Sequence, residues 1–306
     1  MNACSRPASR GVRPLIRRAQ RADDSRVRVL LLIAVGLWLA PLLPAQDTVS
    51  SRVDWVRSKV TITIERPVPL AGPNRPAAVA DTQAAILRDA PPLVAAELAL
   101  IRYDTYRSIG EFVAAHPDRV GRLDETARTA RPVTYSVSTD LRLARVTFEI
   151  DLHAQLAGRF VTHTRPARLP VHLGWVPSDA YTGVIIYAAD RLPVHGTTSS
   201  RHIEPALAPN LHYIGSDGLI YRLTGHESFS AEVLRLAGPV EYSASVADAE
   251  RSERAGNRPL RVLARGLFGE VPTDIVLGLS DAKLLLADES NRRLITDGRI
   301  VVVIAP

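Results

Sequence analysis

The first stretch with a clear pattern runs from Asp54 to Arg66, where apolar and polar residues alternate. The apolar set is Val60, Ile62 and Ile64, and the polar set is Lys59, Thr61, Thr63 and Glu65. Because successive side chains of a strand point to opposite faces, this alternation predicts a strand with one buried face and one face in water.

A loop with proline and glycine follows at residues 67–76, and an Ala/Leu-rich stretch at residues 77–101 has the composition of a helix. Pro91 and Pro92 are expected to break or restart this helix, because proline lacks the backbone N–H and crowds the preceding turn. Two shorter helices are predicted at residues 108–115 and 117–129.

The clearest local pattern is a pair of alternating runs at residues 133–137 and 146–156, joined through Thr139 and Asp140. Two such runs close together predict an antiparallel hairpin with one wet face. The first half is therefore expected to be β-α-β-β. The predicted fold class is α+β, with mainly antiparallel sheets and helices packed on one face.

Beyond an Arg- and Pro-containing boundary at residues 164–170, we expect strands at residues 183–188, 219–223 and 259–268 and a turn at residues 215–218. Ser280 is expected to cap a helix that continues to Asp297, with Gly298 as its stop. The unbroken β-branched run at residues 300–304 predicts a strand covered on both faces.

The first 45 residues have a composition of their own. Eight arginines precede the uncharged apolar run Val29–Leu43, and a small residue, Ala45, follows it. This order is typical of an export signal. The alternative is a retained anchor, although the run has 15 residues and a spanning helix needs about 20. The expected organisation is residues 1–45 as signal or anchor, 46–165 as the β-α-β-β region and 166–306 as a second α+β region.

Residues 1–45, which we call the leader, also account for the net positive charge of the chain. The net charge is +6 overall, but thirty basic and thirty acidic residues follow Ala45. The basic character therefore gives no argument for binding nucleic acid. The single cysteine, Cys4, lies in the leader as well, so the processed chain is expected to hold neither a disulfide nor a thiolate metal site. Lipidation is not expected, because no cysteine follows the apolar run.

No motif in the processed chain defines a catalytic or metal site. The histidines, among them His153, His163, His195, His202 and His212, are too loosely spaced for zinc, and ordinary surface positions are expected for them, as for the adjacent pair His226 and Glu227. The residues from Gly215 to Gly218 indicate a turn and not a nucleophile elbow. The nearest carboxylate pairs are Asp124 with Glu125 and Glu149 with Asp151, for which surface charge is the expectation. No catalytic, cofactor-binding or metal-binding residue is predicted, and no cofactor.

Four aromatic residues could serve a contact surface: Trp55, Trp175, Tyr181 and Tyr187. Core packing is the expectation for each, because aromatic side chains bury a large apolar area.

Several segments of the second half, taken in order, resemble the FlgP-like group of exported bacterial envelope proteins. They are residues 181–186, 205–209, 218–221, 257–262, 264–266, 273–277 and 281–304. The resemblance implies a periplasmic or outer-membrane location and a structural role in flagellar or envelope assemblies, and it carries no catalytic residues. Two departures are Tyr187-Ala188-Ala189-Asp190, where the group often has Asp-Ala-Arg-Gly, and the missing lipidation cysteine.

These observations favour an exported, non-catalytic structural or binding protein of the cell envelope, located in the periplasm, with envelope proteins or cell-wall components as partners. One alternative is a periplasmic hydrolase that uses scattered Asp, Glu and His residues. Another is a protein anchored in the inner membrane by Val29–Leu43, which would then make the membrane contact.

Overall fold

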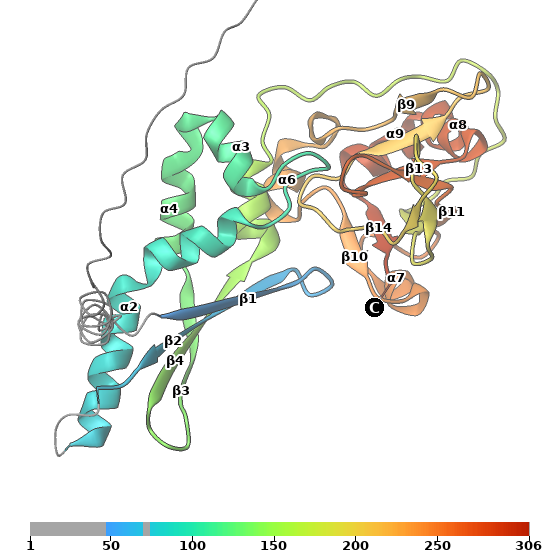
Figure 1. The fold of residues 1–306 in the computed structure, drawn as a ribbon. Helices are drawn as coiled ribbons and strands as arrows, with labels where there is room; N and C mark the ends of the chain where they lie inside the picture. The colour runs from blue at the N-terminus through green and yellow to red at the C-terminus, as the bar shows by residue number, and fades with distance from the viewer. Residues whose placement is uncertain (1–46, 70–73, 306) are drawn as a thin grey trace, which may run out of the picture. The chain divides into compact units, whose positions relative to one another are not determined.

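In the first half of the chain, four antiparallel strands form one sheet in the order β1-β2-β4-β3 (Figure 1). Their bounds are Thr48–Asp54, Lys59–Pro67, Arg131–Val137 and Leu143–Asp151 for β1 to β4. The computed structural model describes residues 47–69 and 74–305, so the predicted signal or anchor lies outside the described residues. Of the described helices, none is both long and apolar enough to span a bilayer.

Three helices follow β2: α2 (Arg75–Ala99), α3 (Ile109–Ala115) and α4 (Val120–Arg128), with a short 3₁₀ turn at Pro117–Arg119. Helix α2 contacts β2, β4, α3 and α4. It covers the face on which the alternating apolar residues of β2 and β4 are buried: Val60, Ile62, Ile64, Val146, Phe148 and Ile150. The α+β class, with helices on one face of an antiparallel sheet, is confirmed.

The opposite face of this sheet is polar, as the alternation predicts. Lys59 Nζ donates to Glu149 Oε1 at 2.6 Å, and the hydroxyls of Thr63 and Thr147 lie 3.1 Å apart. The order of elements differs from the predicted β-α-β-β because β1 pairs with β2 as an additional edge strand.

The predicted break at Pro91 and Pro92 is wrong. Helix α2 continues through both prolines, although Figure 1 shows that it changes direction along its length. Proline has no N–H to donate to the carbonyl four residues earlier, so the carbonyls of Leu87 and Arg88 lose their helical hydrogen bonds. Both of these residues are exposed. Water can therefore satisfy the two carbonyls, and the helix need not end.

The second predicted hairpin strand ends five residues early. At Asp151 the chain turns into a π-helical segment, Leu152–Ala157, followed by the short helix α5 (Gly158–Phe160). The Asp151 carboxylate accepts hydrogen bonds from the backbone N–H groups of His153 and Ala154 at 2.9 and 2.7 Å. This cap ends the strand, although the apolar alternation continues to Leu156.

The second half contains a four-stranded, wholly parallel sheet in the order β10-β14-β5-β11. The strands are Glu241–Ser243, Ile300–Val303, Val184–Tyr187 and Leu260–Leu263, in that order. Alternate residues of β5 and β14 enter two separate apolar clusters, with Ile186 and Val302 in one and Ile185 and Val301 in the other. The prediction that the final strand is covered on both faces is confirmed. Helix α7 (Val246–Arg251) contacts β5, β10 and β14.

A second sheet in this half has the order β12-β13-β8-β9, with strands Gly266–Phe268, Asp274–Leu277, Leu211–Ile214 and Ile220–Arg222. The strand expected at residues 259–268 is divided between the two sheets as β11 and β12. The division falls where Ala264 N donates to Tyr187 O and Arg265 N donates to Val276 O. Two short strands of two residues each, β6 (Leu192–Pro193) and β7 (Ser200–Arg201), pair antiparallel and complete the described strands.

The long helix expected from Ser280 to Asp297 is two helices, α8 (Leu279–Ala287) and α9 (Glu289–Thr296). Gly278, not Ser280, is the first N-cap. Asp288 adopts an extended conformation and accepts from Ser290 N, so it caps α9. Gly298 has φ +60° and ends α9 as predicted. Helix α6 (Ala231–Leu236) packs against the π-helical segment of the first half.

Residues 47–306 form one compact unit, and the loop at residues 102–107 joins its two halves. Leu207 N donates to Arg102 O and Ala208 N donates to Tyr103 O. Thr105 binds Val271 in both directions, through Val271 N to Thr105 O at 3.2 Å and through Thr105 Oγ1 to Val271 O at 2.6 Å. The larger apolar cluster contains residues of both halves.

Candidate functional site

The two carboxylate pairs singled out in the sequence lie on the surface. Three of the four carboxylates form ion pairs or cap a turn. Glu125 faces Arg159 at 3.2 Å, and Glu149 faces Lys59 at 2.6 Å. Asp151 caps the π-helical turn, and Asp124 is exposed on α4. The fold does not bring these residues into one cleft, so their arrangement gives no support to acid–base hydrolysis.

The histidines do not converge either. Within residues 47–69 and 74–305, no three His, Asp or Glu side chains are placed to hold a metal ion. Several histidines have local partners instead: His116 Nδ1 lies 2.8 Å from Phe112 O, His163 Nε2 lies 2.7 Å from Phe229 O, and His202 Nδ1 lies 3.1 Å from Ala189 O.

His153 is a correction to the sequence analysis. It was expected at an ordinary surface position, but the turn at Asp151 places it in the π-helical segment, close to Gly238. Burial, together with the nearby charge of Arg254, lowers the pKa of its imidazole to about 4. Both effects disfavour the protonated ring, so His153 is neutral at pH 7.

A second correction concerns His212, which is not at the surface. It lies on β8 with 6% of its surface exposed, beside Asp274 of β13, which is 1% exposed. The distance from His212 Nε2 to Asp274 Oδ2 is 3.1 Å. Asp274 also accepts from Asn210 N, Asn210 Nδ2 and Thr273 Oγ1, at 3.0, 2.9 and 3.0 Å.

The His212–Asp274 pair has the elements of an oriented general base, because a carboxylate holds one ring nitrogen. Its position argues for another role. Both side chains are withdrawn from water, and the ring of His212 lies 4.7 Å from that of Phe268. Donors from Asn210, Thr273 and His212 converge on one carboxylate and fasten β8 to β13. We therefore assign the cluster to the stability of the second sheet.

The surface feature that stands out is an extended segment, residues 162–178, which we call the connecting segment. Its side chains at three alternate positions are strongly exposed: Val171 at 56%, Leu173 at 95% and Trp175 at 88%. The expectation that Trp175 packs in the core is wrong. Trp55, in contrast, is partly buried and packs edge-on against Tyr242, with ring centroids 5.8 Å apart.

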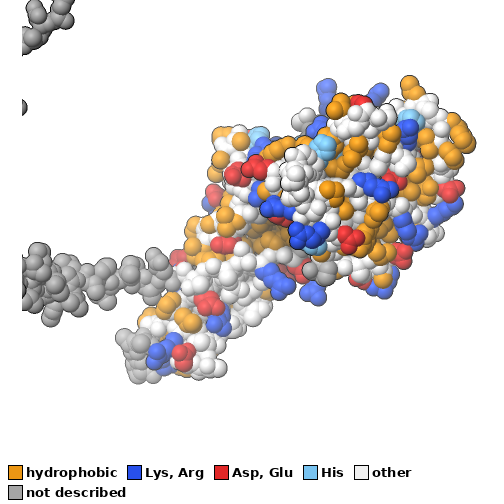
Figure 2. Space-filling model, turned by 45° about the vertical axis from the view of Figure 1, so that its right-hand side comes forward, with side chains coloured by type: hydrophobic (Ala, Val, Ile, Leu, Met, Phe, Trp, Pro, Cys, Tyr) orange, Lys and Arg blue, Asp and Glu red, His pale blue; other side chains and the backbone are white. Residues whose placement is uncertain are grey.

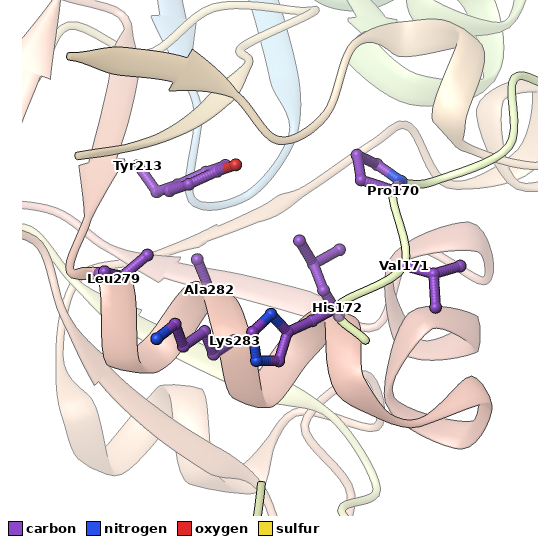
Figure 3. A pocket seen from close by; sticks show the side chains of 8 residues that line it. Pro170, Val171, His172, Tyr213, Leu279, Ala282 and Lys283 are labelled. Carbon is purple, nitrogen blue, oxygen red and sulfur yellow. The ribbon is translucent and has the colours of Figure 1, made fainter. Parts of the chain in front are cut away.

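Three hollows lie along the connecting segment. One of about 120 Å³ is bounded by Tyr213 of β8 on one side and by α8 on the other, with Pro170 and His172 on the segment (Figure 3). A second of about 490 Å³ lies between residues 166–171 and α9, where Arg168, Arg292 and Arg293 line it. The third, also about 490 Å³, lies beside Trp175 and the end of α8. Apolar and basic groups therefore occur together here.

Comparison with known proteins divides the chain at this same segment. Residues 46–158 match the family model of the N-terminal domain of Tp0624 from Treponema pallidum, and residues 183–306 match the model of its second domain. Both halves are similar to Tp0624. No curated protein matches the chain.

The two Tp0624-like regions occur in the order of the domains they resemble, and they leave residues 159–182 between them. The exposed row at Val171, Leu173 and Trp175 lies in this interval. Sequence reasoning missed the row, although a signal was present: from Thr162 to Ser178 the chain has two arginines, two histidines and no acidic residue. Sequence reasoning also missed the buried pair, for which the signal was a carboxylate directly before the apolar residues of β13.

Proposed function

We propose that this protein is exported and serves in the bacterial cell envelope as a non-catalytic structural or binding protein. The observation that carries the proposal is the connecting segment, which holds three large apolar side chains in water beside basic residues. Large apolar side chains that are grouped on one segment and left in water favour contact with another body. The dispersed carboxylates and histidines offer no comparable case for catalysis.

The composition of residues 1–45 supports the proposed location. Eight arginines followed by an uncharged apolar run and Ala45 fit an export signal better than a spanning anchor. The resemblance of the second half to FlgP-like envelope proteins agrees with the same location. The FlgP-like location is part of our proposal, and the family models that match the chain are those of Tp0624.

Two measurements test this proposal. Cells that produce the protein are fractionated, and the N-terminus of the exported form is sequenced. A new terminus at Gln46 supports a cleaved signal, whereas a retained Val29–Leu43 run supports the anchored alternative. Recovery of the intact chain only in the cytoplasm would contradict export.

The second measurement is photo-crosslinking in place from residue 173, with residue 100 as the matched control. Leu100 is also a strongly exposed leucine, at 72%, but it lies at the end of α2. We expect crosslinks to envelope material from residue 173 and not from residue 100. Equal yields from both positions would remove the connecting segment as the contact site.

A further inference from the structure

The connecting segment is built to hold apolar side chains away from the fold. It has no regular secondary structure, and Pro166, Pro170 and Pro177 restrict its backbone. It contacts the body of the unit at separate points: Ala167 N donates to Glu227 O at 2.6 Å and His172 N donates to Leu286 O at 3.3 Å, while Val171 and Leu173 on either side of His172 are exposed. Proline fixes φ and lowers the entropy of the free segment, so less entropy is lost when a partner orders it on binding.

The groups around the row are mainly basic. Arg168, Arg292 and Arg293 line the hollow next to Val171, and the acidic residue among its lining residues is Glu289. Glu289 accepts from Arg293 at 2.6 Å, and Arg292 donates to Leu286 O at 2.7 Å. Lys283 adds a positive charge at the neighbouring hollow. The acidic groups at the far end are Asp288, beside Trp175, and Asp179, which pairs with Arg258 at 3.0 Å. Figure 2 shows apolar, basic and acidic side chains interspersed over the face of the unit that it presents.

This combination fits a lipid surface better than a protein surface. Tryptophan and leucine flanked by arginine are the residues that enter the interface of an anionic membrane, with the ring at headgroup level and the guanidinium groups on phosphates. A stable protein interface buries about 800 Å² on each partner around a central pocket. A single extended row of three side chains with a basic border is narrower than such an interface.

We propose that the connecting segment docks on an anionic phospholipid surface, with Leu173 and Trp175 inserted between headgroups and with Arg168, Arg292 and Arg293 against lipid phosphates. This proposal deepens the proposed envelope function and rests on it for access to a membrane. Vesicle binding tests lipid docking separately from export. The purified protein can bind lipid even if the export proposal is wrong, and it can fail to bind lipid even if the protein is exported.

The test uses the full chain with Trp38→Phe and Trp55→Phe, which leaves Trp175 as its one tryptophan. The probe is a vesicle of equimolar phosphatidylglycerol and phosphatidylcholine, with phosphatidylcholine alone as the comparison. We expect Trp175 emission to shift to the blue and to be quenched by brominated acyl chains only with the anionic vesicles. High salt should weaken the response, because it screens the arginines.

Leu173→Asp should weaken the Trp175 response by about tenfold or more, because a charge would enter the interface. The matched control, Leu100→Asp, should leave it unchanged, and circular dichroism checks that both variants are folded. The Trp175 signal is specific to the segment even when residues 1–45 attach the chain to the vesicle. An unchanged Trp175 emission on vesicle-bound protein overturns the proposal. An emission shift that depends on protein concentration without lipid would indicate docking of a second copy and would also overturn it. Equal losses of the Trp175 response in Leu173→Asp and Leu100→Asp would do the same.

Discussion

A carboxylate withdrawn from water needs hydrogen bonds in place of its hydration, and Asp274 receives them from Asn210, Thr273 and His212. Asp274→Ala would leave these buried donors without an acceptor. We expect it to lower the free energy of unfolding by about 3 kcal/mol or more. Asp274→Asn keeps one acceptor oxygen but brings an extra donor, so a smaller loss of about 1–2 kcal/mol is expected.

Urea denaturation of the purified protein measures both losses. The matched control is Asp124→Ala on the exposed face of α4, which should change the stability by less than about 0.5 kcal/mol. If Asp274→Ala were as mild as Asp124→Ala, the cluster would not fasten β8 to β13.

His153 predicts how stability depends on pH. Its pKa in the folded protein is lowered to about 4, chiefly by burial, from an ordinary value of 6.5. Below pH 6.5 the unfolded chain takes up a proton at this ring, whereas the folded protein does so only near pH 4. Stability is therefore lost as pH falls through this window, by an amount on the order of 3 kcal/mol at most.

Urea midpoints measured between pH 7.5 and pH 4.5 check this dependence. His153→Gln should flatten the acid side of the curve, because glutamine does not titrate there. His202→Gln, at an exposed histidine, should leave the slope of the parent protein unchanged. A parent curve that is flat between pH 7 and pH 5 would contradict the burial of His153.

At the scale of single elements, the prolines of α2 provide a paired test. Pro92 lies in the helix interior and is exposed, whereas Pro76 lies in the first turn, where no partner exists for its N–H. Pro92→Ala restores a donor toward the Arg88 carbonyl and should raise the free energy of unfolding by about 1 kcal/mol. Pro76→Ala should be neutral or slightly destabilising. Thermal unfolding followed by circular dichroism measures both, and equal effects would contradict the positional argument.

Alternation of apolar residues predicted where several strands lie, because the period of two is a local property of the chain. It did not predict where they end. The run after Asp151 continues in phase, but the Asp151 carboxylate caps a turn. The run at residues 259–268 also continues, but its partner changes from Tyr187 to Val276 between two adjacent residues. The first outcome depends on a local side-chain cap that hydrophobic alternation does not register, and the second depends on partners that are distant in sequence.

The exposed row and the buried pair were likewise only partly predictable from the sequence. The acid-free composition of residues 162–178 is visible in the sequence, but composition alone does not separate an exposed Trp175 from a buried one. The difference arises because the Tp0624-like halves share a core to which the segment between them contributes Leu169 but not Trp175. The pairing of His212 with Asp274, 62 residues apart, requires the parallel register of β8 with β13.

At the scale of the whole unit, the shared core and the 102–107 loop predict that both halves unfold together. Gly269 tests this coupling. It has φ +112°, and a Cβ added there would meet the Thr105 hydroxyl that binds Val271. Gly269→Ala should therefore strain the backbone and displace the loop, with a loss of about 2 kcal/mol.

Hydrogen exchange measured across a urea series reports each half through its own amides, those of β4 for the first half and those of β5 for the second. If the unit is cooperative, Gly269→Ala moves both sets of midpoints to lower urea by the same amount. Gly121→Ala is the matched control, because no neighbour lies within 4 Å of its added Cβ and α4 gains a better helix former. It should raise both midpoints slightly. Loss of protection in β5 while β4 stays protected would mean that the 102–107 loop joins two independently stable halves, and the connecting segment would then be a linker between them.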